Sequence, residues 1–187
     1  MLVIDLKGKF EMRINKGDKI GELQLPSTSG NNFDISEVSG KKTLITFYRF
    51  ATCPFCNLRL NEFSKRFDEL DKNFRVVAIF DSSIEFLTKN TKKHSAPFPI
   101  LADENFEYFK KFEVEQSLWK FLIGSTLGSL KIFSAFARGY FPRELRSMTT
   151  VPVDILLNED GIVEKVYYGT NTTDHLKFDE IKNFSIS

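Results

Sequence analysis

The fold follows from residues 43–60, which read TLITFYRFATCPFCNLRL. Residues 43–48 are almost continuously apolar or β-branched, which is typical of a strand covered on both faces. The apolar positions that follow are spaced as on one face of a helix, at Cys56, Leu60, Phe63, Phe67 and Leu70. The stretch therefore predicts a buried strand and then an amphipathic helix, with a pair of cysteines at the junction.

The two cysteines of this junction, Cys53 and Cys56, are the only ones in the chain. Pro54 suits the first position of the helix, which makes Cys53 the N-cap residue. There the unpaired backbone N–H groups and the positive end of the helix dipole stabilise a thiolate and lower its pKa. Cys56 lies one turn further and begins the apolar stripe. We therefore predict a redox-active dithiol in which Cys53 is the exposed nucleophile and Cys56 the buried resolving thiol.

A structural or metal-binding role for the C-x-x-C pair is less consistent with the sequence. Two cysteines cannot make a disulfide framework, and a structural zinc site needs four ligands, for which no second cysteine pair exists. His94 and His175 could be recruited, but their spacing forms no local metal motif. Chance is disfavoured by the preceding strand and the proline within the motif. The prediction is a thiol redox centre with no metal and no organic cofactor.

Strand and helix patterns alternate along most of the chain. Strands are predicted over residues 43–48, 74–80 and 98–101, with helical patterns between and after them. Parallel crossovers of this kind are typical of the α/β class. Residues 23–35 and 153–168 each read as a β-hairpin, because turn residues separate two β-prone runs.

Two further segments complete the single domain, residues 1–187, that this length predicts. Residues 115–150 are rich in large apolar side chains and predict a helical insertion, broken at Gly124-Ser125 and at Gly139. Residues 173–184 predict a helix that closes the domain.

The net charge and the lengths of the apolar runs limit which partners and which cellular compartment we expect. A formal net charge of +1 argues against nucleic acid or an acidic membrane as the main partner, since both favour a strongly basic face. The first apolar run is too short for the core of a signal peptide. Residues 121–130 form the longest later uncharged run, about half the length that spans a bilayer. We expect a cytoplasmic protein that binds neither membrane nor nucleic acid.

Thr150-Val151-Pro152 stands directly before the first strand of the second predicted hairpin. Proline is disfavoured in a strand unless it marks a special turn. Because a dithiol lies upstream, we predict a cis bond before Pro152, which would expose the backbone of Val151 to an extended thiol-bearing substrate. A trans proline at the start of a strand is the alternative. Val151 and Pro152 are therefore candidate substrate-binding residues.

Further candidates lie near the dithiol. Arg49 follows the central strand at its carboxyl end, where α/β sheets collect function, and a cation there would lower a thiol pKa; a surface salt bridge is the alternative. Thr52 and Pro54, which flank the first cysteine, are candidates to contact the substrate. His175 follows Asp174, the predicted N-cap of the last helix, and is interpreted as a capping-segment histidine without chemistry.

The segment from Phe47 to Leu58, with its Tyr-Arg pair before C-P-F-C-N, resembles the peroxiredoxin (AhpC/TSA) family of the thioredoxin-fold superfamily. Similarity extends to the N-terminal stretch from Gly17 to Ser36 and to the C-terminal stretch from Tyr168 to Glu180, so it covers nearly the whole chain. The resemblance implies a thioredoxin-like fold, a central mixed sheet flanked by helices. The N-terminal β-hairpin would be an extension of that fold.

Typical peroxiredoxins place a threonine three residues before the peroxide-reducing cysteine and a proline four residues before that threonine. Aligned on Cys56, these two places hold Cys53 and Arg49. The resemblance therefore makes Cys56 the peroxide-reducing position, whereas the helical geometry favours Cys53 as the nucleophile. The order in which the two thiols react stays open.

The resemblance implies an enzyme that reduces peroxides or disulfides through a Cys53–Cys56 disulfide. An external thiol of the thioredoxin or glutathione type would reduce that bond again, and a homodimer is an assembly open to the protein. Two alternatives remain. One is a thioredoxin- or glutaredoxin-like disulfide oxidoreductase without peroxidase activity, and the other is a non-enzymatic, redox-regulated binding module that uses residues 115–150.

Overall fold

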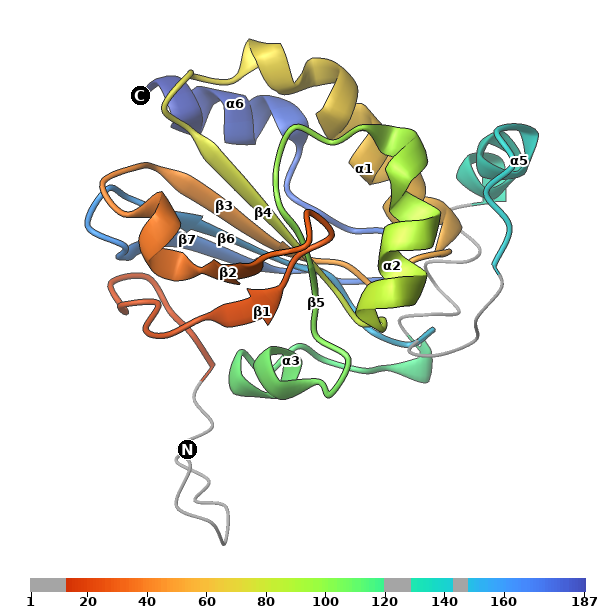
Figure 1. The fold of residues 1–187 in the computed structure, drawn as a ribbon, viewed down its shortest axis with the longest axis horizontal. Helices are drawn as coiled ribbons and strands as arrows, with labels where there is room; N and C mark the ends of the chain where they lie inside the picture. Colours follow the sequence, from red (N-terminus) through yellow and green to blue (C-terminus); the bar gives the residue numbers. More distant parts are fainter. Residues whose placement is uncertain (1–12, 120–128, 143–147) are drawn as a thin grey trace, which may run out of the picture.

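The computed structural model describes residues 13–119, 129–142 and 148–187 (Figure 1). At its centre is a five-stranded sheet with the order β5-β4-β3-β6-β7. The strands are β3 (Thr43–Phe47), β4 (Arg75–Phe80), β5 (Ile100–Ala102), β6 (Val153–Leu157) and β7 (Val163–Tyr168). β3, β4 and β5 pair in parallel, whereas β6 runs antiparallel to both β3 and β7. The predicted α/β class and the central mixed sheet are confirmed.

Helices and a small hairpin cover the two faces of this sheet (Figure 1). One face carries α1 (Pro54–Arg66), α2 (Ile84–Thr91) and α6 (Phe178–Ile186). The other carries α3 (Glu107–Lys111) and the hairpin of β1 (Gln24–Pro26) and β2 (Asn32–Asp34). Short 3₁₀ turns follow β2, α1 and α2, at η1 (Ile35–Val38), η2 (Phe67–Glu69) and η3 (Lys92–His94). No helix in the described part of the chain is long and apolar enough to cross a membrane.

Alternate side chains of the central strands fill two separate cores. In β3, Leu44 packs in the core beneath α1 and α6, while Ile45 and Phe47 pack in the core beneath α3 and the hairpin. β4 divides in the same way, because successive side chains of a strand point to opposite faces. Burial on both sides explains why these strands read as continuous apolar runs.

Both predicted hairpins are present. In the first, Leu25 of β1 pairs with Phe33 of β2, and Ser27 forms a bridge to Leu101 that joins the hairpin to β5. The second consists of β6 and β7, whose connecting turn includes Gly161 at a φ of 73°, a conformation that glycine adopts without strain.

The two ends of the segment 115–150 lie side by side. Val151 N donates to the carbonyl of Glu115 and Ser117 N donates to that of Thr149, both at 2.8 Å. Within this segment, α5 (Ser129–Ala137) packs against α1. Gly139 follows α5 with a positive φ of 76°, which ends the helix as predicted. The predicted break at Gly124-Ser125 lies outside the described residues.

The last helix begins later than predicted. α6 has Lys177 as its N-cap, so the assignment of Asp174 as the cap is wrong. The carboxylate of Asp174 instead accepts hydrogen bonds from the N–H and hydroxyl of Thr170, at 2.8 and 2.6 Å, and from the hydroxyl of Tyr167 at 2.9 Å. The carboxylate therefore stabilises a turn that follows β7, and the helix starts only after that turn.

A substitution of Phe63 in α1 tests the packing between α1 and α6. Its ring is 1% exposed and lies 5.1 Å from the ring of Phe178 and 6.4 Å from that of Phe98. We expect Phe63→Ala to lower the free energy of unfolding by about 3–5 kcal/mol in urea denaturation, because it leaves a cavity where α1 meets α6. Phe133→Ala is the control. Its side chain is 78% exposed, so a change of more than about 0.5 kcal/mol there, or less than that at Phe63, would contradict this packing.

Candidate active site

The dithiol lies where β3 leads into α1. Cys53 is the N-cap of α1, with φ −60° and ψ 122°, and Pro54 takes the first helical position, as predicted. The N–H of Cys56 donates to the sulfur of Cys53 at 3.4 Å. Both thiols are free. One thiol therefore caps the helix from which the other projects.

Both sulfurs lie inside the protein. Cys53 is 0% and Cys56 3% exposed, so the prediction that Cys53 is exposed is wrong. The preceding loop is tied inward, because the N–H of Ala51 donates to the hydroxyl of the buried Ser82 at 2.9 Å. A cleft of about 540 Å³ reaches the dithiol, and Cys56, rather than Cys53, lines it.

Asn57 holds this loop, a role that the sequence patterns did not predict. Its buried amide donates to the carbonyls of Ala51 and Cys53, both at 2.8 Å, and its oxygen lies 2.7 Å from Nε2 of His94. Burial lowers the pKa of His94 to about 4, and the charge of Lys93 adds to this, so the ring is neutral and donates to Asn57. The signal for this role in the sequence was Asn57 itself, a polar residue directly after Cys56.

The dithiol has one acidic and one weakly acidic member. Burial raises the pKa of the Cys53 thiol, but hydrogen bonds from Cys56 and the charge of Arg49 together lower it to about 6. Burial and the neighbouring Cys53 raise the pKa of Cys56. The pair therefore carries one negative charge at neutral pH, on Cys53, with the Cys56 thiol as its hydrogen-bond donor.

Arg49 lies beside both sulfurs. Its side chain is almost fully buried, its backbone N–H donates to the sulfur of Cys56 at 3.4 Å, and one guanidinium nitrogen donates to the carbonyl of Met148 at 3.0 Å. The guanidinium carbon lies 5.6 Å from the centre of the Phe55 ring. A buried cation is costly without a counter-charge. The thiolate of the dithiol supplies one, so each group stabilises the charged form of the other.

The bond before Pro152 is trans, so the predicted cis bond is wrong. Pro152 directly precedes β6, where it costs the sheet no ladder hydrogen bond. The N–H of Val151 already donates to Glu115, so it is not free to pair with a substrate. Pro152 lines the cleft together with Arg49. Val151, Thr52 and Pro54 are not among the lining residues.

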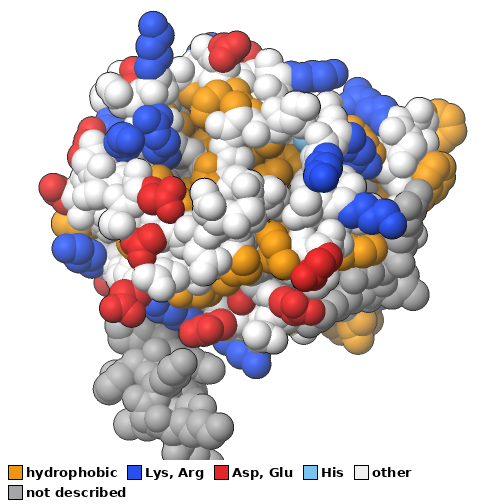
Figure 2. Space-filling view, viewed as in Figure 1, with side chains coloured by type: hydrophobic (Ala, Val, Ile, Leu, Met, Phe, Trp, Pro, Cys, Tyr) orange, Lys and Arg blue, Asp and Glu red, His pale blue; other side chains and the backbone are white. Residues whose placement is uncertain are grey.

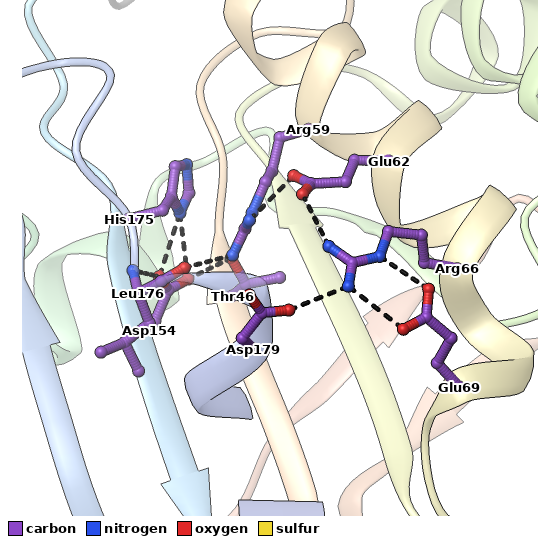
Figure 3. Close-up of polar contacts among 9 residues, drawn as sticks. All are labelled: Thr46, Arg59, Glu62, Arg66, Glu69, Asp154, His175, Leu176 and Asp179. Atoms are coloured by element: carbon purple, nitrogen blue, oxygen red, sulfur yellow. Dashed lines mark hydrogen bonds and ion pairs between the residues drawn. The ribbon is translucent and has the colours of Figure 1, made fainter. Parts of the chain in front are cut away.

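A second polar network borders the same cleft (Figure 3). The carboxylate of Asp154, which is 1% exposed on β6, accepts from the hydroxyl of Thr46 at 2.6 Å and from the N–H of Leu176 at 2.8 Å. Nδ1 of His175 lies 3.1 Å from each carboxylate oxygen. His175 precedes Lys177, the N-cap of α6, and contacts Asp154, so its interpretation as a residue of the capping segment is wrong.

The outer wall of the cleft is a row of ion pairs along α1 (Figure 3). Glu62 contacts Arg59 at 3.0 Å and Arg66 at 3.5 Å, and Arg66 also contacts Asp179 at 2.9 Å. Arg59 reaches inward and donates to the carbonyl of Leu176. The row connects α1 to α6 along the wall of the cleft. Within the described residues, no group of three or more His, Cys, Asp or Glu side chains could hold a metal ion.

The charge of Arg49 can be tested by titrating the dithiol. We expect Arg49→Gln to raise the first thiol pKa from about 6 toward the ordinary value of about 8.5, because it removes the cation that favours the thiolate. Thiolate absorbance against pH measures this. Arg138→Gln is the control, since Arg138 lines the cleft but is not among the main causes of the shift in either thiol pKa. An unchanged titration in Arg49→Gln would contradict this electrostatic account.

The chain matches the model of the AhpC/TSA family over residues 16–166. Peroxiredoxin Bcp of Escherichia coli K12 is 24% identical over 165 residues, which cover 87% of this chain and 90% of that protein. Peroxiredoxin Bcp of Bacillus subtilis is 29% identical over 58% of this chain and 68% of that protein.

Solved structures of low sequence identity share the fold. A thiol peroxidase from Chromobacterium violaceum superposes with a TM-score of 0.63 at 18% identity, covering 91% of this chain and 86% of that one. A variant of peroxiredoxin 6 from Arenicola marina gives a TM-score of 0.70 at 14% identity, over 93% and 73% of the two chains. The fold is therefore the thioredoxin fold of peroxiredoxins. The protein belongs to the AhpC/TSA family and is a thiol oxidoreductase.

Proposed function

We propose that this protein reduces peroxides through a reversible disulfide between Cys53 and Cys56. The observation that carries the proposal is a buried thiol pair, with one pKa of about 6, that meets a cleft beside a buried arginine. The E. coli and B. subtilis relatives are named peroxiredoxins, which agrees with this chemistry.

Cys56 is the thiol that meets the peroxide in this proposal. It lines the cleft, whereas Cys53 is fully buried and does not. The negative charge rests on Cys53, but its hydrogen bond with the Cys56 thiol provides a direct route for the proton to move from Cys56 to Cys53. The N–H of Arg49 then stabilises the thiolate that forms on Cys56. Cys53 thus acts first as a base and later as the resolving thiol.

The reaction balances in two steps. The Cys56 thiolate attacks the terminal oxygen of a hydroperoxide, the O–O bond breaks, and the sulfur is oxidised to a sulfenic acid while an alkoxide leaves and takes up a proton. Cys53 then attacks the sulfur of the sulfenic acid, the disulfide forms, and water leaves with the proton of Cys53. An external thiol of the thioredoxin or glutathione type returns two electrons to the disulfide.

Disulfide reduction is a second candidate function. The C-x-x-C pair at the N-terminus of α1, with one thiol of low pKa, is suited to thiol–disulfide exchange. The ratio of two rates distinguishes the functions, because a peroxidase consumes hydroperoxide much faster than it reduces a model disulfide. The opposite ratio would assign the protein as a disulfide reductase.

A binding role or a homodimer would use the surface formed by α5 and the residues that follow it. Hydrophobic side chains gather at the edge of the molecule where α5 lies (Figure 2). Phe133, Phe136 and Phe141 are 78%, 40% and 53% exposed. Such aromatic exposure is typical of contact surfaces. Oxidation of the dithiol without turnover, together with a change in self-association, would favour a redox-regulated binding module over an enzyme.

Single cysteine variants test the order of the two thiols. We expect Cys53→Ser to form a sulfenic acid on Cys56 with one equivalent of hydroperoxide. Cys56 still lines the cleft beside Arg49, it loses the neighbouring thiolate that raises its pKa and so ionises without Cys53 as a base, and its resolving partner is gone. Cys56→Ser should not react. A sulfenic-acid-trapping reagent followed by mass spectrometry measures both.

The doubly substituted protein, with both cysteines changed to serine, is the control for background oxidation. Trapping on Cys53 in Cys56→Ser, with none on Cys56 in Cys53→Ser, would reverse the proposed order. Lack of peroxide reaction in the wild-type protein would overturn the peroxidase function itself.

A further inference from the structure

We propose that His175, held by the buried carboxylate of Asp154, is the general acid of the cleft and gives its Nε2 proton to the group that leaves when the dithiol attacks. This inference rests on the proposed function, because it concerns the same cleft and the same sulfur. It assigns a role to a histidine and a carboxylate that the thiol chemistry leaves unused.

Asp154 is unusual for its place in the fold. It lies within β6 in the centre of the sheet, opposite Thr46 of β3, where every other residue of β6 is apolar. A carboxylate in such a place costs free energy unless donors surround it. Burial raises the pKa of Asp154, but the contributions of His175, Arg59 and Thr46 outweigh it, so the group is ionised.

An ionised carboxylate only accepts hydrogen bonds. Nδ1 of His175, which lies 3.1 Å from both of its oxygens, must therefore carry a proton. The ring is fixed by this contact and by the ring of Tyr48, whose centre is 5.3 Å away. Figure 3 shows the second ring nitrogen pointing away from Asp154. A carboxylate that fixes the tautomer of a histidine leaves Nε2 available for proton transfer.

His175 and Cys56 share one cleft. Both line it, and Tyr48 lines it with them. Burial raises the pKa of Tyr48, so this phenol keeps its proton, and its ring centre lies 5.3 Å from that of His175. A substrate that meets Cys56 is therefore in the same space as the imidazole ring.

Tyr48, the arginines and the two carboxylates that line the cleft are poorer acids. Tyr48 holds its proton firmly because it is buried, and arginine does not release its proton in proteins. Glu62 and Asp179 form ion pairs with Arg66. Imidazole is the side chain whose ordinary pKa suits proton transfer near neutral pH.

The step balances as follows. The sulfur of Cys56 forms a bond to the terminal oxygen of an alkyl hydroperoxide and is oxidised, and the O–O bond breaks. The departing alkoxide takes the proton from Nε2 of protonated His175 and leaves as an alcohol. Water in the open cleft returns a proton to the ring. Asp154 does not gain the proton; it is a positioning residue that keeps Nδ1 protonated and stabilises the charged ring.

The test compares two oxidants that differ in the leaving group. tert-Butyl hydroperoxide releases a strongly basic alkoxide that needs a proton, whereas peracetic acid releases acetate, which does not. We expect His175→Gln to slow oxidation of the dithiol by tert-butyl hydroperoxide about 10²-fold. The rate with peracetic acid should change less than about 3-fold. Asp154→Asn should show the same selective loss, because the amide can stabilise the wrong tautomer.

The peracetic acid rate of each variant serves as its own control, since it reports an intact dithiol and cleft. Thr46→Val, which removes one donor to Asp154, is a milder variant should Asp154→Asn fail to fold. Equal slowing with both oxidants, or no slowing with either, would overturn the role of His175 as an acid while leaving the peroxidase proposal intact. A wild-type protein that reacts with neither oxidant would instead refute the proposed function.

Discussion

The candidate active site depends on one interaction: a buried arginine lies beside a pair of buried thiols. The guanidinium of Arg49 and the thiolate of Cys53 would each be costly to bury alone, and each lowers the cost of the other. The scaffold fixes them, because Arg49 follows the end of β3 and Cys53 begins α1. The N-cap position supplies backbone N–H groups, and Asn57 holds the loop between them.

A second buried charge lies on the same face of the sheet. Asp154 of β6 lies opposite Thr46 of β3 and accepts a hydrogen bond from its hydroxyl, on the face that α1 and α6 cover. Cys56 and His175 both line the cleft. The buried Arg49–Cys53 pair and the buried carboxylate of Asp154 thus both lie close to one cleft. In a domain whose other central strand residues are mostly apolar, such an arrangement points to chemistry rather than to stability.

Local patterns predicted the elements and the position of the dithiol, because apolar spacing and the Pro54 N-cap rule act over a few residues. They did not predict burial. Cys53 is buried because Ser82 and Asn57 hold the preceding loop against the protein. Ser82 is distant in the sequence, and the apolar pattern gives no role to a polar residue such as Asn57. The bond before Pro152 was mispredicted for a similar reason, since Glu115 occupies the N–H of Val151. The contact of His175 with Asp154 could not be predicted, because it depends on how the segment after β7 lies against β6. A single aspartate in the apolar strand 153–157 was a visible signal that a partner existed.

The most direct test is to treat the fully reduced protein with one equivalent of hydroperoxide and to map its peptides by mass spectrometry. We expect a single intramolecular disulfide between Cys53 and Cys56, with the loss of two hydrogen atoms and no other change in the chain. Two unmodified thiols after hydroperoxide has been added, or oxidation of Cys56 to a sulfinic acid with Cys53 left free, would contradict it.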